Sequence, residues 1–189
     1  MTYAGFWRRF GAYWLDFLVL TPLVALSLWG YSHFRLFNLY YFVPGMAFSF
    51  FYSVYLVRQY GGTPGKLMAG LRIRKLDGTQ VGYREAVLRY LPEWLLTAMT
   101  SIGIIIATLG MTDSEYWSLG WMARSQHLQA AAPPWFRAVN LTLQVWIWSE
   151  FVVMMTNRKR RALHDFIAGT VVLVEHASDV AAPTPELPS

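Results

Sequence analysis

Residues 8–29, RRFGAYWLDFLVLTPLVALSLW, place two arginines directly before an apolar run that is long enough to cross a bilayer. An α-helix rises about 1.5 Å per residue, so roughly 20 apolar residues span the hydrocarbon core. Three further runs have a similar length, and the candidate spans are about residues 10–29, 40–57, 90–109 and 136–155. The sequence therefore predicts an all-α membrane protein with four transmembrane helices.

The composition agrees with this class of protein. Of the 189 residues, 55% are hydrophobic, 17% are aromatic and only 14% are charged. These values lie on the apolar side of ordinary soluble domains, so we expect the lipid bilayer to surround the chain. The absence of cysteine excludes disulfides and thiolate metal sites, and the four histidines lack ligand spacing. We therefore expect neither a metal nor a cofactor.

The positive charges are sorted by side. Thirteen of the 16 Lys and Arg residues fall at the N-terminus, between the second and third spans, or after the fourth. Basic residues resist translocation, which predicts that both termini and the central loop are cytoplasmic, in a bacterial plasma (inner) membrane. This sorting accounts for the net charge of +5, so we do not expect nucleic acid as a partner. The opening segment also resembles a signal peptide, but Asp16 interrupts its apolar run, and we expect no cleavage.

The segments between the spans predict a small cytoplasmic β-hairpin. A helical turn is expected over residues 64–70, followed by a strand over residues 71–76. Asp77-Gly78 favours a turn, with a return strand through Val81. The β-branched run over residues 170–174 is the candidate for a third strand.

The chain divides into two parts by composition. Residues 1–176 form the predicted transmembrane domain, and residues 177–189 are proline-rich and polar, as is typical of a disordered tail. The external loop over residues 111–134 contains several Trp and Tyr residues. It suits either a helix lying at the headgroups or a solvated loop.

Three acids lie at a similar depth inside the predicted helices. Helix rise places Asp16, Glu93 and Glu150 about 5–9 Å from the cytoplasmic boundary. A charged, lipid-facing side chain would cost about 3 kcal/mol or more, so we expect these acids to face a polar, cytoplasm-facing pocket. Arg9 shares a helix face with Asp16. Helical side chains lean towards the N-terminus, however, which carries the Arg9 side chain away from Asp16. We therefore expect Arg9 to meet another acid, such as Asp165.

A polar stripe on the third span and a glycine-rich segment around Lys66 are two further candidate features. On the third span, Arg89, Glu93, Thr97 and Thr100 form a polar stripe that could line a path. The segment GGTPGK, which ends at Lys66, does not match the Walker phosphate-binding pattern, because leucine follows the lysine where serine or threonine is required. We expect this glycine-rich segment to be a hinge that places Lys66 at the cytoplasmic headgroups. The sequence shows no set of residues that would supply a nucleophile, a general base and an oxyanion site together. We therefore do not expect an enzyme.

Three segments together carry a family resemblance: residues 8–16, residues 62–78 and residues 163–172. In this order they resemble the RDD family of membrane proteins, which is named for one arginine and two aspartates. Arg9, Asp16 and Asp165 match those three positions. The resemblance implies an integral membrane protein with a suspected role in transport, and it names no substrate.

Two functions follow from these observations. The first is transport of a small cation or proton through a cytoplasm-facing acidic pocket. A homodimer, which would double the helix count, is one way to complete such a path. The second is a non-catalytic membrane scaffold or assembly factor, because buried pairs of arginine and acid can also lock helices together, with a protein partner that the sequence does not identify. The candidate functional residues are Arg9, Asp16, Asp165, Glu150, Glu93, Arg89 and Lys66.

Overall fold

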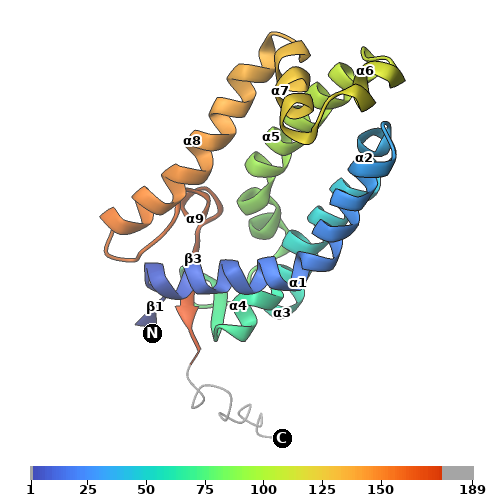
Figure 1. Ribbon diagram of the computed structural model, residues 1–189. Helices are drawn as coiled ribbons and strands as arrows, with labels where there is room; N and C mark the ends of the chain where they lie inside the picture. The colour runs from blue at the N-terminus through green and yellow to red at the C-terminus, as the bar shows by residue number, and fades with distance from the viewer. Residues whose placement is uncertain (1, 176–189) are drawn as a thin grey trace, which may run out of the picture.

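The computed structural model describes residues 2–175 as a bundle of long helices with a small sheet at one end (Figure 1). In these residues, four helical segments are long and apolar enough to cross a membrane: Phe6–His33, Phe37–Tyr60, Tyr83–Leu109 and Trp135–Thr156. The first, third and fourth are the single helices α1, α5 and α8, and the second consists of α2 (Phe37–Phe50), the π-helical η1 (Phe51–Tyr55) and α3 (Leu56–Tyr60). Each predicted span lies inside one of these segments, which confirms the fold class.

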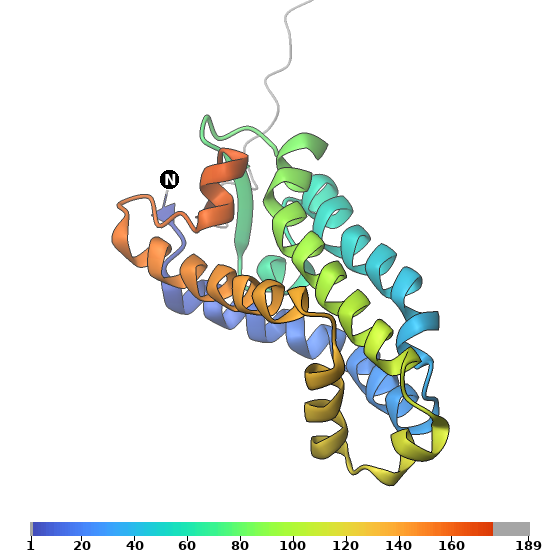
Figure 2. The same cartoon turned by 90° about the horizontal axis from the view of Figure 1, so that it is seen from above.

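Helix α1 changes direction part-way along its length, as both views show (Figures 1 and 2). Pro22 lies inside this helix. Proline lacks the backbone N–H that would bond to the preceding turn, and its ring crowds that turn, so a proline inside a helix commonly bends it.

The sheet has three short antiparallel strands in the order β1-β3-β2. Their bounds are Thr2–Tyr3 for β1, Leu71–Lys75 for β2 and Thr170–Val174 for β3. The predicted third strand is therefore confirmed, with Leu71 opposite Val174 and Lys75 opposite Thr170. The predicted hairpin is only half right, because its return arm is a single bridge between Arg74 and Gln80. Strand β1 was not predicted, since two residues are too short to carry a pattern.

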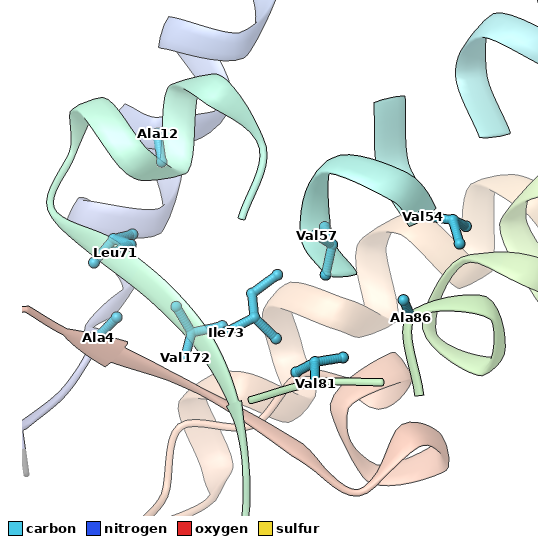
Figure 3. Close-up of a cluster of buried hydrophobic side chains, with 9 residues drawn as sticks. All are labelled: Ala4, Ala12, Val54, Val57, Leu71, Ile73, Val81, Ala86 and Val172. Atoms are coloured by element: carbon cyan, nitrogen blue, oxygen red, sulfur yellow. The ribbon is translucent and has the colours of Figure 1, made fainter. Parts of the chain in front are cut away.

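Buried apolar side chains hold this end of the bundle together (Figure 3). β2 has the sequence LRIRK, and its alternation turns Leu71 and Ile73 into the core while Arg72 and Arg74 are only half-buried. Val172 of β3 packs in the same cluster. The helices and loops supply its other fully buried members, Ala4, Ala12, Val54, Val57, Val81 and Ala86. We call this region, with α4 (Pro64–Met68) and α9 (Leu163–Ala168), the sheet end.

The opposite end of the bundle is formed by α6 (Asp113–Ser118) and α7 (Trp121–Ala131), which connect α5 to α8 (Figures 1 and 2). We call it the loop end. Helix α6 begins with a capping box, in which Thr112 Oγ1 accepts a hydrogen bond from the Glu115 backbone N–H at 3.3 Å and Glu115 Oε2 accepts one from the Thr112 N–H at 2.8 Å. The segment between α5 and α8 thus contains two helices where one helix or a loop was expected. The predicted tail, residues 177–189, lies outside the described residues.

Candidate functional site

Asp165, at the start of α9, is a fully buried carboxylate with charged partners on both oxygens. Arg9 Nη1 lies 2.9 Å from Oδ2, and Arg89 forms an ion pair with Oδ1. The Thr170 hydroxyl donates to Oδ1 at 3.0 Å, and the Ala162 backbone N–H donates to Oδ2 at 3.0 Å. The carboxylate therefore joins α1, α5 and α9 through bonds that leave it no free lone pair for a ligand.

The charge of Asp165 is fixed by these partners. Burial alone would raise the pKa of Asp165, but the neighbouring cations, Arg89 foremost, hold that pKa well below its usual range. The group therefore stays ionised throughout the physiological pH range. All acceptor sites of this buried carboxylate are used by two arginines and two further donors, and the ion pairs lock the helices in place.

Arg9 and Asp16 do not pair with each other, although they lie on one face of α1. Arg9 pairs with Asp165, as the lean of helical side chains predicted, and its Nη2 also donates to the Arg160 carbonyl at 2.6 Å. Arg9 therefore belongs to the Asp165 cluster.

Asp16 has its own set of partners, all uncharged. Tyr52 Oη donates to Oδ1 at 2.6 Å, and Thr63 Oγ1 donates to Oδ2 at 2.6 Å. The Gly65 backbone N–H donates to Oδ1 at 2.7 Å. The carboxylate thus holds η1 and the start of α4 against α1.

Gly65 allows this close contact between α4 and α1. A Cβ atom at this position would lie 2.3 Å from Asp16 N and 2.4 Å from the Ala12 carbonyl oxygen. Both neighbours are backbone atoms of α1, which cannot move without bending the helix. The position therefore requires glycine for its small volume.

Lys66 follows Gly65 and lies near the same charged groups. Its Nζ donates a long hydrogen bond of 3.4 Å to Thr63 Oγ1. Burial, followed by the positive charge of Arg89, lowers the pKa of Lys66, and the charge of Asp16 partly opposes this effect. The Lys66 side chain is half-buried in the bundle, and its expected position at the headgroups stays a prediction.

Glu150 and Glu93 are the two remaining candidate acids. Glu150 of α8 is bonded to His164 Nδ1 of α9, and His164 Nε2 lies 3.8 Å from Asp165 Oδ1. Glu93 is half-buried one turn beyond Arg89 on α5. Asp16 and Glu150 bond to different groups, but the negative charges of both act to raise the pKa of Lys66. The expectation that the acids share one polar pocket therefore stays a prediction.

Two cavities lie beyond Asp16, towards the loop end. The middle cavity, of about 520 Å³, is bounded by α1, α2, η1 and α5, and Tyr52 is in its wall. The loop-end cavity, of about 360 Å³, lies beneath α6 and α7. Tyr31, Asn38 and Ser101 line both cavities. The middle cavity is mainly apolar, with hydroxyl groups from Ser27, Tyr41, Ser49, Ser53, Tyr90 and Thr97.

Comparison with known proteins gives the family. The RDD family matches residues 3–169, a range that covers most of the chain and includes Arg9, Asp16 and Asp165. The chain belongs to the RDD family. A search of the curated proteins and a search of the solved structures found no match.

In this RDD-family protein, the three matched residues all lie in the hydrogen-bonded sheet end. Sequence reasoning did not identify Tyr52, Thr63 and Gly65 as partners of Asp16, nor Thr170 as a partner of Asp165. The only signal was the run of small and polar residues before Lys66. Such a run permits close contact with another helix, but it does not identify that helix. Within residues 2–175, no group of three His, Cys, Asp or Glu side chains is arranged to hold a metal ion.

Proposed function

We propose that this integral membrane protein transports a small cation or a proton, with the middle cavity as part of the path and Asp16 at its sheet end. One observation carries the proposal. Tyr52 lines the middle cavity, and its hydroxyl also donates to Asp16 Oδ1 at 2.6 Å. A hydroxyl-bearing cavity inside the membrane therefore leads to an ionisable side chain, which is a common feature of ion and proton pathways.

The chemistry of Asp16 suits a group that exchanges its partners. Its three donors are neutral, and two of them are hydroxyls that can rotate. An arriving cation or proton can take the place of the Tyr52 hydrogen on Oδ1, after which the hydroxyl oxygen can accept or coordinate. Such a rearrangement needs no movement of a helix.

The Asp165 cluster has a different role in this proposal. Its carboxylate is held by two arginines, so we assign Arg9, Arg89 and Asp165 to positioning of α1, α5 and α9. Lys66, beside the Asp16 site, supplies a positive charge that compensates the carboxylate when no cargo is bound. The sorting of basic residues puts the sheet end on the cytoplasmic side.

The test is flux into liposomes that contain a pH-sensitive dye, under sodium, potassium and proton gradients. The wild type should show flux, Asp16→Asn should abolish it, and Tyr52→Phe should reduce it severalfold. Tyr55→Phe is the matched control, because Tyr55 belongs to the same π-helical segment and its side chain is 39% exposed. Circular dichroism and gel filtration must show that each variant is folded. Unchanged flux in folded Asp16→Asn would refute the proposal.

A scaffold or assembly factor is the second candidate, favoured by a specific observation. Trp7, Tyr13 and Trp14 are exposed along the first half of α1, a surface that could contact either lipid or a partner helix. No flux of any tested ion, with normal reconstitution of the wild type, would favour this function, and cross-linking in membranes would then search for the partner.

A further inference from the structure

The loop-end cavity is lined by Arg124, which contacts two aromatic rings and has no acidic partner among residues 2–175. The Arg124 guanidinium lies over the ring of Tyr116, at 4.2 Å from its centroid, and also over the ring of Trp117, at 5.1 Å. These contacts fix the orientation of the guanidinium and leave its charge in place.

Most N–H donors of the Arg124 side chain make no hydrogen bond within the described residues. Its Nη2 donates to the Leu119 carbonyl at 3.0 Å, whereas its buried Nε has no hydrogen-bond partner. No ion pair involving Arg124 occurs in the part of the chain that the structure describes. The guanidinium group suits a carboxylate or phosphate, because it can donate two parallel hydrogen bonds to either group.

The acids nearest in sequence are already engaged. Asp113 pairs with Arg35, and Glu115 bonds to the backbone and hydroxyl of Thr112 at the start of α6. The lining of the loop-end cavity itself includes no acidic side chain. Its polar groups are amides and hydroxyls, so the charge of Arg124 dominates the cavity.

The size and composition of the cavity suit a small amphipathic molecule. Its volume of about 360 Å³ falls in the range of ligand pockets, about 300–1,000 Å³. Asn38, Gln129 and Asn140 offer amide groups, while Ile104, Leu128 and Phe136 form an apolar wall. One charged anchor, a few amides and an apolar wall are the usual components of a binding site.

We propose that the loop-end cavity binds an organic anion, whose carboxylate or phosphate head pairs with Arg124 and whose apolar body packs on Leu128 and Phe136. The head can come from a free metabolite or from a lipid. This site does not depend on the proposed transport. If both proposals hold, the bound anion neutralises a positive charge at the loop end of the path, because the two cavities share Tyr31, Asn38 and Ser101.

The experiment is a calorimetric titration of the purified full-length protein in a nonionic detergent. Benzoate is the carboxylate probe, and benzamide is its neutral control of the same shape. Dihexanoyl phosphatidylglycerol tests the lipid source against dihexanoyl phosphatidylcholine. We expect benzoate or the phosphatidylglycerol to bind about tenfold or more tightly than its control, as a charge-assisted hydrogen bond predicts. The probe that binds identifies the source of the anion.

Variants connect the binding to the cavity. Arg124→Gln should weaken binding about tenfold or more, and Arg124→Lys should weaken it less, because the charge stays while the planar fork is lost. Arg137→Gln is the matched control, since Arg137 is an exposed arginine at the start of α8. Asn140→Asp provides a second test that leaves Arg124 and its aromatic contacts intact, and it should weaken binding by placing a negative charge in the cavity wall.

Three results would overturn the inference: no binding of either anion, equal binding of benzoate and benzamide together with equal binding of the two lipids, or anion binding that folded Arg124→Gln and Asn140→Asp both leave unchanged.

Discussion

Arg9 and Arg89 at the sheet end and Arg124 at the loop end are stabilised in different ways. At the sheet end, Arg9 and Arg89 both pair with Asp165, and hydrogen bonds from Thr170 and Ala162 complete the cluster. At the loop end, Arg124 rests on aromatic rings beside a cavity. Satisfied polar groups fix one arrangement, while an unpaired charge beside open space is available to a ligand. The comparison assigns stability mainly to the sheet end and adaptability mainly to the loop end.

The largest effect is expected for Asp165→Asn. This change keeps the shape of the side chain but leaves Arg9 and Arg89 as buried charges without a carboxylate. Breaking a buried ion pair in this way costs about 3–5 kcal/mol, so the free energy of unfolding should fall by that amount in a denaturant titration in detergent micelles. The control is Asp113→Asn at the loop end, whose side chain is 77% exposed and which should cost less than about 1 kcal/mol. Equal losses in the two variants would contradict the comparison.

Acid should remove part of the same stabilisation. The pKa of Asp165 in the folded protein is held below that of an unfolded aspartate, about 3.9. Its contribution to stability is therefore complete above about pH 5 and is lost as the pH falls towards the folded pKa. We expect the free energy of unfolding of the wild type to decrease more steeply between about pH 5 and pH 2 than that of Asp165→Asn. Parallel curves for the two proteins would show that Asp165 is not the titrating group.

Gly65→Ala tests the backbone contact at the sheet end. The added methyl group would overlap backbone atoms of α1, and overpacking of this kind costs about 1–3 kcal/mol. Thermal unfolding followed by circular dichroism measures the loss. Gly11→Ala is the control on α1, because its Cβ would meet no atom within 4 Å, and it should leave the stability unchanged or raise it slightly.

The smallest effect is expected for Gly103→Ala towards the loop end. Its Cβ would lie 2.6 Å from Phe136 Cδ2, which belongs to a side chain in the wall of the loop-end cavity. The ring has space to move into, so the loss should stay below about 1 kcal/mol in the same thermal measurement. A loss larger than that of Gly65→Ala would show that the loop end is packed as tightly as the sheet end.

Hydropathy was sufficient to predict the spans, because a bilayer requires about 20 apolar residues from each of them. The β-branched run over residues 170–174 predicted β3, and the lean of helical side chains predicted that Arg9 would pair with an acid other than Asp16. Both signals are local, so a single sequence contains them.

The contacts of Asp16 could not be predicted in the same way. Tyr52, Thr63 and Gly65 lie 36, 47 and 49 residues from Asp16 in the sequence, and they meet it only because α1, η1 and α4 pack together. The depth argument grouped Asp16 with Glu93 and Glu150, but depth does not determine the direction of a side chain around the helix, so it could not identify these partners. The cavities are likewise gaps in the packing of several helices, which no short segment encodes.

The position of β3 has a consequence for the order of assembly. β3 lies between β1 and β2, although it follows both of them in the sequence, and Asp165 precedes it by only a few residues. All four spans precede Asp165 and β3 in the chain, so the ribosome synthesises the spans first. Until Asp165 and β3 have been made, β1 and β2 lack their common neighbour, and Arg9 and Arg89 lack their carboxylate. A polypeptide that ends before Leu163 would therefore reach the membrane with its sheet end unassembled, and quality-control proteases could distinguish it from the finished protein.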